Sequence, residues 1–547
     1  MTALHSAIVA LLLFLNFPLA AAEALAQRLD VLAAKHFKEN APGAAVLVTK
    51  GGTPLLRKGY GMADLEQGTK MTPEAVFRIG SITKQFTAAA VLQLVESGKV
   101  ALDDPLAKYF PAVPTGGKTV TIEHLLTHTS GIPSYTDKAE LRKRLTEELT
   151  PQQIIDTVRD EPMRFDPGTK WSYNNSGYTL LGMIVEQVSG MPYAEYLEKN
   201  VFPRAGLTHT RYGSTRPIVP GRVPGYSLAG GKVVNADYVS MSIPYAAGAL
   251  LSTVDDLARW TAAVAAGKVV DRKLVDKAWT PYRLTSGEDS GYGYGWRLSP
   301  VAGERVIQHG GSIHGYSSHA MWLPEHHLYV AVLTNNQAFD PDFVTGLLAL
   351  EAIGKPWDTG EVKMTPAELE AYAGVYRIDE KTRRKVIVEE GKIYSLRDGG
   401  SRLEMFPAGK DEFRFRGSFN RMSFERDAAG NITALTLESG STKTRSPKTD
   451  EKLVTRTVIA IDPAKLDRYT GKYELSPTTV LTISRKDGGL VAAPSGGREM
   501  PLFPESETTW FAKVTDVELV FRFDERGVAS GVTLNQGGQS RELKKIE

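Results

Sequence analysis

The clearest apolar pattern in the chain runs from Phe86 to Val95, where nearly every position is apolar. A helix that is apolar on all faces is buried on all sides, and Gly98 is typical of the residue that follows a helix end. The pattern therefore predicts a buried helix. Ser81 and Lys84 fall in its first turn, and because residues i and i+3 share a helix face, their side chains should lie one above the other.

Strand patterns occur on both sides of this helix and predict one sheet. The expected strands are 44–49, 54–60, 305–308, 318–323 and 328–334. The first two are joined by Gly51-Gly52, which is typical of a hairpin turn. Helical patterns cover 24–39 and 341–353, and residues 102–280 are expected to be mostly helical. Both ends of this region therefore complete one sheet, with a helical insertion beside it.

Beyond Lys355-Pro356 the pattern changes to short alternating strands, and it repeats. The motif Leu-x-x-Tyr-x-Gly-x-Tyr occurs at 369–376 and again 97 residues later at 466–473, and Phe406 recurs at the same separation as Phe503. An ungapped repeat indicates two copies of one module. Each copy is predicted to be a small antiparallel β-barrel. The modules could be structural, form a dimer surface or contribute to a cleft.

The N-terminus is typical of an export signal. Residues 7–15 form an apolar core, and the small residues before Glu23 favour cleavage after Ala22. We therefore expect an exported protein, periplasmic or secreted, without strong membrane association after cleavage. A retained anchor is the alternative, because no Lys or Arg precedes the apolar core. The predicted division of the chain is 1–22 signal peptide, 23–357 main domain, 358–457 first barrel and 458–547 second barrel.

Composition narrows the chemistry. The 65 basic and 63 acidic residues give a formal net charge of +2, so no global field attracts nucleic acid, and no nucleic-acid partner is expected. Cysteine is absent, which excludes thiol catalysis, cysteine-ligated metals, disulfides and a lipidated cysteine anchor.

Three short stretches could carry hydrolytic chemistry. Ser81 would be a nucleophile if Lys84, with its pKa lowered by apolar surroundings, accepted its proton. Tyr173 and Asn175 precede a helical run, and Gln308 to Ser312 end a predicted strand. Each stretch alone has an ordinary interpretation: a helix cap beside a surface lysine, a core aromatic residue, and a turn.

Together these stretches resemble the penicillin-recognising serine hydrolases, which include class C β-lactamases, D-alanyl-D-alanine carboxypeptidases, D-aminopeptidases and β-lactamase-like esterases. The resemblance extends over roughly 24–351, and the matching stretches are 77–84, 125–133, 173–178, 248–260 and 309–311. It implies an α/β fold: a β-lactamase-like sheet flanked by helices, with a helical subdomain, here followed by two lipocalin-like β-barrels.

The resemblance also implies roles for individual residues. Ser81 would be the acylated nucleophile, and Lys84 and Tyr173 would share the acid and base work. Which of the two takes the serine proton is left open by the sequence. Asn175 would hold the substrate amide, and the N-H groups of Ser81 and Ser312 would form the oxyanion hole. No metal or organic cofactor is implied.

The expected substrate-binding residues His309, Gly310 and Gly311 stand where class C β-lactamases usually have Lys-Thr-Gly. A histidine is only partly charged near neutral pH, and glycine lacks the threonine hydroxyl that helps bind a carboxylate. This departure favours a peptidase or amidase for D-amino-acid compounds over an efficient β-lactamase. The paired barrels resemble the D-aminopeptidase arrangement, in which a loop of the last barrel meets the substrate's amino group, and Asp487 is a candidate for that contact.

Several alternatives use the same residues. They are a β-lactamase-like carboxylesterase, a weak β-lactamase, and a non-catalytic penicillin-binding receptor. The expected partner is a small-molecule or peptide substrate, and a homodimer is one further alternative.

The histidines outside these stretches do not predict a metal site. His124 and His128 are four residues apart, but Leu125 replaces the glutamate of the zinc-protease motif, so a structural role is expected. His326 and His327 are expected in a polar turn.

Overall fold

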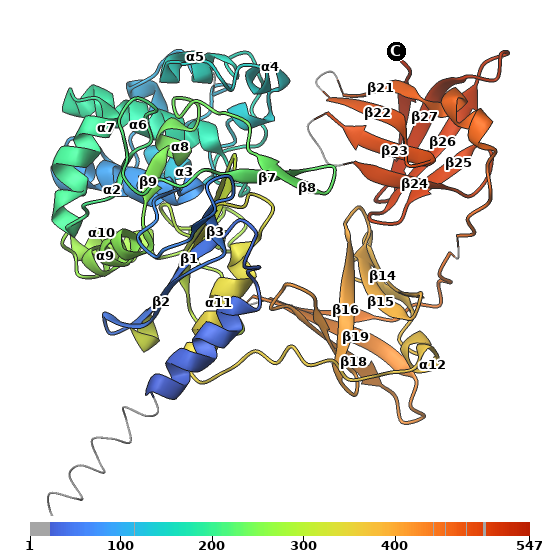
Figure 1. Ribbon diagram of the computed structural model, residues 1–547. Helices are drawn as coiled ribbons and strands as arrows, with labels where there is room; N and C mark the ends of the chain where they lie inside the picture. The colour runs from blue at the N-terminus through green and yellow to red at the C-terminus, as the bar shows by residue number, and fades with distance from the viewer. Residues whose placement is uncertain (1–21, 114, 441, 455, 477–478, 496–498) are drawn as a thin grey trace, which may run out of the picture. The chain divides into compact units, whose positions relative to one another are not determined.

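The computed structural model describes residues 22–113, 115–440, 442–454, 456–476, 479–495 and 499–547 (Figure 1). Residues 1–21 of the predicted signal peptide lie outside the described residues, and that peptide stays a prediction. The contacts divide the chain into two compact units, one up to Trp357 and one from Asp358 to Glu547. Each unit is described by itself below.

The first unit is built on a five-stranded antiparallel sheet in the order β10-β11-β12-β1-β2. The strands are β1 (Ala44–Lys50), β2 (Thr53–Tyr60), β10 (Ile307–Ile313), β11 (Tyr316–Leu323) and β12 (Leu328–Thr334). Strand β1 pairs with β12 along its whole length, so both ends of the unit do complete one sheet, as the sequence predicts.

The two faces of this sheet are covered by different helices. Val46 and Val48 of β1 pack with α11 (Pro341–Ala352) and with the N-terminal helix over 22–34. Ala45 and Leu47 point to the opposite core, which contains α2 (Thr83–Glu96). Because successive strand side chains point to opposite faces, a strand covered on both sides is apolar at nearly every position.

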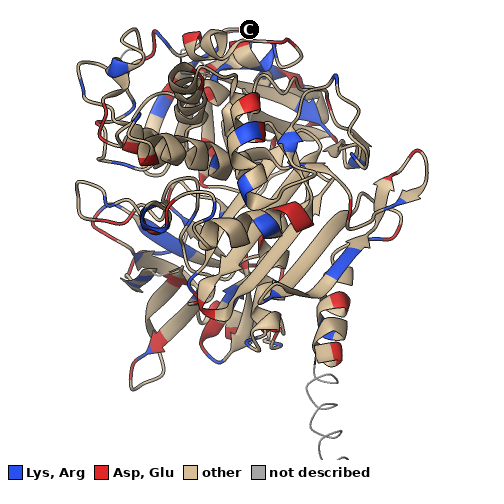
Figure 2. Cartoon of the chain, turned by 90° about the vertical axis from the view of Figure 1, so that its left-hand side faces the viewer, with Lys and Arg blue, Asp and Glu red and all other residues tan. Residues whose placement is uncertain are grey.

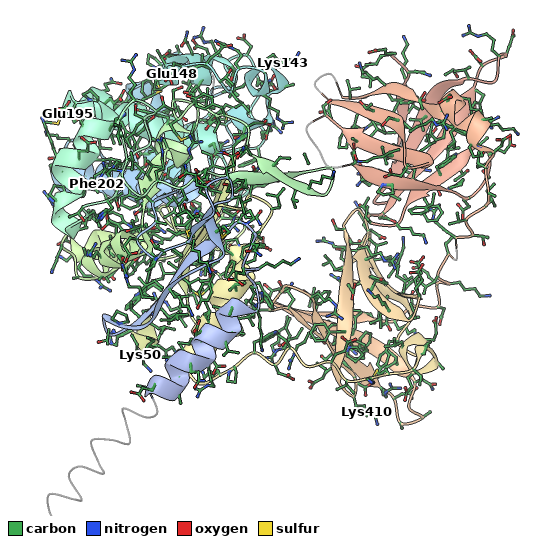
Figure 3. All side chains as sticks on the ribbon, viewed as in Figure 1. Lys50, Lys143, Glu148, Glu195, Phe202 and Lys410 are labelled. Atoms are coloured by element: carbon green, nitrogen blue, oxygen red, sulfur yellow. The ribbon has the colours of Figure 1, made fainter. Side chains whose placement is uncertain are left out.

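The helical part beside the sheet is larger in the structure than the sheet itself. The other helices of the unit are α3 (Ile122–Leu126), α4 (Ala139–Arg142), α5 (Pro151–Asp156), α6 (Asn175–Ser189), α7 (Tyr193–Tyr196), α8 (Tyr245–Gly248), α9 (Val254–Ala265) and α10 (Arg272–Ala278). Aromatic packing joins several of them: the ring of Phe86 on α2 stacks on Trp260 at 4.0 Å, and Phe202, labelled in Figure 3, meets Phe86 edge-on at 6.0 Å.

Short strands also occur within this region. They are β3 (Met62–Asp64), β4 (Thr69–Lys70), β5 (Phe77–Arg78), β6 (Arg211–Tyr212), β7 (Tyr226–Ala229), β8 (Lys232–Asn235) and β9 (Leu250–Ser252). Strand β9 pairs with both β5 and β6, so the chain just before Ser81 is held by a small second sheet. Strands this short give too few alternating positions to be recognised from the pattern.

The second unit contains two eight-stranded antiparallel sheets. The first sheet is formed by β13 (Gly374–Arg377), β14 (Arg383–Glu389), β15 (Lys392–Arg397), β16 (Arg402–Gly409), β17 (Glu412–Phe415), β18 (Arg421–Arg426), β19 (Ile432–Ser439) and β20 (Thr442–Pro447). The second sheet is formed by β21 (Gly471–Ser476), β22 (Thr479–Lys486), β23 (Gly489–Pro494), β24 (Met500–Pro504), β25 (Thr509–Ala512), β26 (Val517–Phe523), β27 (Ala529–Gln536) and β28 (Gln539–Lys544). A short helix, α12 (Pro366–Glu370), precedes the first sheet.

The two sheets close in the same way, which confirms two barrel-like modules. Tyr376 bridges to Lys448 in the first and Tyr473 bridges to Lys545 in the second, so each sheet is nearly closed between its first and last strands. In both copies this tyrosine hydroxyl is buried and donates to the backbone carbonyl four residues earlier, at 2.6 Å and 2.9 Å. Each sheet encloses its own apolar core.

Charged residues are interspersed on the first unit. Figure 2 shows Lys and Arg next to Asp and Glu along its helices and loops. Among the described residues, no helix has both the length and the apolar content that a bilayer crossing requires.

Candidate active site

Ser81 lies in a 3-10 turn, Gly80–Ile82, that leads directly into α2. The sequence places Ser81 inside the first turn of the α-helix, and this detail is wrong. Gly80 has φ of +49°, a conformation that favours glycine, so the chain tightens before the α-helix begins. Residues three apart still share a face in this geometry, and Ser81 therefore lies over Lys84 as expected.

Strand β10 lies against this turn at a distance that only glycine permits. A Cβ atom on Gly311 would lie 2.0 Å from the carbonyl oxygen of Ile79, and a Cβ on Gly80 would lie 2.9 Å from the backbone nitrogen of Ser312. The hydroxyl of Ser318 on β11 also donates to the Ile79 carbonyl, at 2.9 Å. The backbone of Ser312 is therefore held beside the turn that carries Ser81. The oxyanion hole predicted from the N-H groups of these two serines stays a prediction.

Lys84 is fully buried, and all three of its hydrogen-bond neighbours are uncharged. Its Nζ lies 3.1 Å from Ser81 Oγ, 2.8 Å from Asn175 Oδ1 and 2.8 Å from the carbonyl oxygen of Ala247. Burial, and next the positive charge of Arg297, lower the pKa of Lys84 well below the ordinary value for lysine. A neutral amine here can donate to Asn175 and Ala247 and still accept a proton from Ser81.

Tyr173 is the second candidate for proton transfer. Its ring centroid lies 4.7 Å from Lys84 Nζ, and its hydroxyl is buried without a hydrogen bond to the described residues. Burial raises the pKa of Tyr173, whereas Ser81 and Arg297 act in the opposite direction. The phenol therefore stays protonated near neutral pH and is suited to donate a proton.

Asn175 is the first residue of α6, at the loop-to-helix junction that the sequence predicts. Its backbone N-H donates to Ser134 Oγ at 3.2 Å, and its side-chain oxygen accepts from Lys84. Asn174 caps the helix by accepting from the N-H of Gly177 at 2.8 Å. The helix start therefore fixes the amide of Asn175 against the lysine.

His309 and the two glycines lie in the middle of β10, and the predicted strand end at Gln308 is wrong. The strand continues to Ile313 because β11 pairs with it along its full length. His309 is buried, with Nε2 2.8 Å from the Tyr292 hydroxyl and Nδ1 2.6 Å from the carbonyl oxygen of Gly310. Burial lowers the pKa of His309 well below the usual range for histidine, and a positive charge on Lys84 would lower it further. The ring is therefore neutral, and its assignment as a substrate-binding residue stays a prediction.

Arg297 lies next to Tyr173, although no pattern in the sequence indicates it. Its side chain is exposed, and its guanidinium carbon lies 5.9 Å from the Tyr173 ring centroid. Arg297 forms no ion pair with any other described residue. Backbone hydrogen bonds to Gln308, at 2.8 Å and 3.0 Å, bring Arg297 next to β10. The local sequence carries no signal for this, because the contact depends on that pairing.

His124 and His326 make structural contacts away from Ser81. His124 completes a capping box by accepting the N-H of Thr121 at its Nδ1, 3.1 Å away. His326 ends a turn and pairs with Glu304 at 2.9 Å. No cluster of potential metal ligands occurs among the described residues.

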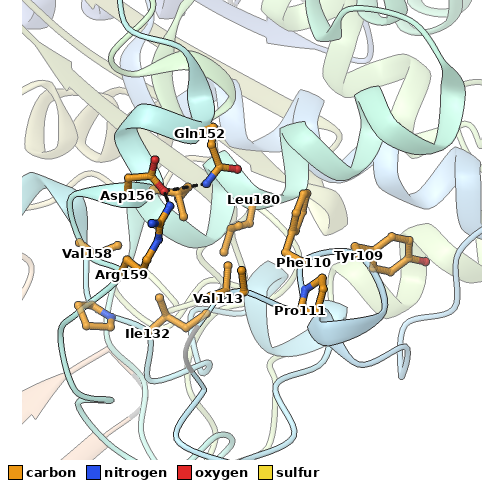
Figure 4. A pocket seen from close by; sticks show the side chains of 13 residues that line it. Tyr109, Phe110, Pro111, Val113, Ile132, Gln152, Asp156, Val158, Arg159 and Leu180 are labelled. Atoms are coloured by element: carbon orange, nitrogen blue, oxygen red, sulfur yellow. Dashed lines mark hydrogen bonds and ion pairs between the residues drawn. The ribbon is translucent and has the colours of Figure 1, made fainter.

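A separate pocket of about 150 Å³ lies in the helical part of the unit (Figure 4). Apolar side chains, among them Phe110, Ile132 and Leu180, form most of its wall, and Asp156 and Arg159 form an ion pair at its edge. None of the candidate site residues lines this pocket.

The fold and the Ser81-Lys84-Tyr173 arrangement define a serine hydrolase of the β-lactamase type. The sequence profile of the Beta-lactamase family matches residues 22–354, more than half of the chain, and the chain belongs to this family. A second profile, described as a domain of unknown function (DUF3471), matches residues 455–545.

Individual relatives agree with this assignment. A penicillin-binding protein of Bacillus subtilis (strain 168) is 29% identical over 425 residues, 72% of this chain and 93% of its own length. The octameric penicillin-binding protein homologue from Pyrococcus abyssi is 28% identical, with a TM-score of 0.56 over 77% of this chain and 99% of its own. The D-amino acid amidase from Ochrobactrum anthropi SV3 is 25% identical, with a TM-score of 0.52 over 60% and 96% of the two chains.

Proposed function

We propose that this protein is a peptidase or amidase that cleaves compounds containing D-amino acids through an acyl-enzyme on Ser81. The observation that carries the proposal is the buried, uncharged environment of Lys84, whose Nζ lies 3.1 Å from Ser81 Oγ. The preference for D-amino acids is supported by the similarity to the D-amino acid amidase.

The reaction follows from the positions of these groups. Ser81 Oγ attacks the substrate carbonyl carbon while its proton moves to the neutral Nζ of Lys84. The bond to the leaving nitrogen breaks, and that nitrogen takes a proton from the Tyr173 hydroxyl, which Lys84 then reprotonates. Water attacks the resulting ester by the reverse sequence of proton transfers and releases Ser81 and the acid product.

Arg297 favours the carboxypeptidase type of substrate. An exposed guanidinium beside Tyr173 attracts a carboxylate on the leaving side of the scissile bond and repels an ammonium group. A substrate with a free terminal carboxylate therefore fits this charge better than a D-aminopeptidase substrate does.

The test compares hydrolysis of N-acyl-D-alanyl-D-alanine, its C-terminal amide and D-alanine anilide, with Ser81→Ala as the blank. We expect the free acid to be cleaved best, and Arg297→Gln to remove the preference for the acid over the amide. Cleavage of the D-alanine anilide alone would instead establish a D-aminopeptidase. If all three compounds are inert while simple esters are hydrolysed, the protein is an esterase and the proposal is wrong.

A further inference from the structure

His128 holds the chain on both sides of Tyr173. Its carbonyl oxygen accepts the N-H of Ser172 at 3.0 Å, and its ring Nδ1 accepts the N-H of Asn174 at 3.1 Å. One residue therefore holds the peptide group that precedes Ser172 and the peptide group that follows Tyr173. The segment 171–174 lies outside any helix or strand, so no regular hydrogen-bond ladder could do this instead.

The ring of His128 also supports the ring of Tyr173. The two ring centroids are 4.4 Å apart, and the ring centroids of Tyr178 and Tyr292 lie 5.1 Å and 4.6 Å from that of His128. The Tyr173 hydroxyl makes no hydrogen bond to the described residues by distance and angle, although Ser81 lies close enough to lower its pKa, so the position of the phenol depends in large part on this packing and on its backbone.

The protonation state of His128 follows from these contacts. Accepting a backbone N-H at Nδ1 requires a lone pair there, so the proton of the neutral ring is on Nε2. Burial is the largest cause that lowers the pKa of His128 well below the usual range, and a positive charge on Lys84 or His309 would lower it further. His128 therefore remains an acceptor throughout the pH range in which Lys84 and Tyr173 exchange protons.

We propose that His128 is a positioning residue that sets the place of the Tyr173 hydroxyl for proton transfer. The inference rests on the proposed role of Tyr173. It also accounts for the backbone of His128, whose φ of 60° is uncommon for a residue other than glycine.

The test compares His128→Asn with His128→Leu. The two new side chains branch at the same atom, but only asparagine keeps an acceptor near the Nδ1 position, and asparagine also tolerates positive φ. We expect His128→Leu to lower kcat about 100-fold with little change in KM, since misplacing a reacting group by about 1 Å can cost that much. The kcat of His128→Asn should be at least about tenfold higher than that of His128→Leu.

A double-mutant cycle with Tyr173→Phe separates positioning from a general structural effect. If His128 acts through the phenol, His128→Leu should cause no further loss of kcat in the Tyr173→Phe background. Equal losses in the leucine and asparagine variants, or losses that multiply in the cycle, would overturn the inference.

Two controls keep the result interpretable. Thermal unfolding of each variant reports whether the fold is retained, and if His128→Leu does not fold, His128→Gly replaces it because glycine adopts the same φ. The wild-type chain and Tyr173→Phe are measured first. Full activity of Tyr173→Phe would contradict the proposed role of Tyr173 and so would be distinguished from a failure of the inference about His128.

Discussion

Lys84 combines complete burial with the absence of any carboxylate among its hydrogen-bond partners in the described part of the chain. In the unfolded chain the same amine is solvated and titrates near its ordinary value. The folded state therefore binds fewer protons than the unfolded state wherever the pH lies between the lowered pKa and about 10.5. Stability contributed by this residue rises with pH across that window.

We expect this dependence to be absent in Lys84→Met, which has no titrating group at this position. From pH 7 to pH 10 the stability of the wild type relative to Lys84→Met should increase, by up to about 1.4 kcal/mol per pH unit. Urea unfolding at several pH values measures the difference in the free energy of unfolding between the two proteins. The contribution of the many buried tyrosines to the pH dependence is the same in both proteins and cancels in this difference. Parallel curves for the two proteins would show that Lys84 is charged in the folded state.

At the residue scale, the sequence predicts the groups that are close in sequence or occur in a family motif. Ser81 and Lys84 are three residues apart, and Tyr173 and Asn175 begin a helix, so local geometry already restricts them. Arg297 and His128 are different. Arg297 reaches the site only through backbone pairing with Gln308, and His128 acts through a contact with Asn174 that is remote in sequence.

At the scale of elements, the contact between β10 and the Ser81 turn depends most strongly on Gly311 and also on Gly80. Gly311→Ala should place a methyl group 2.0 Å from the Ile79 carbonyl oxygen, so the strand must shift. We expect a loss of about 1–3 kcal/mol in the free energy of unfolding, together with a lower kcat, because the strand also carries Ser312.

Gly310→Ala is the matched control for this substitution. Its added methyl group would meet its nearest neighbour, Asp342 Oδ1, at 3.3 Å, a contact that a small side-chain movement relieves. Chemical unfolding and steady-state kinetics of both variants make the comparison. If the two alanines cost the same, the close approach of β10 does not explain the presence of Gly311.

The end of β10 shows why the boundaries of strands are predicted less well than the order of the strands along the chain. The pattern ends the strand at Gln308 because two glycines follow, and glycine is rare inside strands. The structure continues β10 to Ile313, since glycine at 311 is required by the neighbouring turn rather than by the strand. The Leu-x-x-Tyr-x-Gly-x-Tyr repeat is sufficient to predict two barrels, because an ungapped duplication means that both copies adopt the same structure.

At the scale of the whole molecule, the candidate catalytic residues lie in the first unit. Every described contact of Ser81, Lys84, Tyr173 and His309 given above joins residues that precede Trp357. A chain that ends at Trp357 should therefore fold and hydrolyse a small ester such as p-nitrophenyl acetate, with kcat/KM within about threefold of the full protein.

The same truncation also tests what the barrels contribute. The ratio of rates for D-alanine anilide and its N-acetylated form should be measured in both proteins. An unchanged ratio would mean that the barrels, including the candidate residue Asp487, do not select the substrate. Loss of ester hydrolysis on truncation would contradict the independence of the catalytic unit.

The pairing of β1 with β12 has a consequence for the growing polypeptide. Ala44 of β1 pairs with Thr334 of β12, so β1 leaves the ribosome long before β12 is synthesised. A lone hairpin of β1 and β2 is only marginally stable in water. A nascent chain that already contains Ser81, Lys84 and Tyr173 thus lacks the complete sheet that brings these residues together. We therefore expect hydrolysis to begin only after β12 has been synthesised.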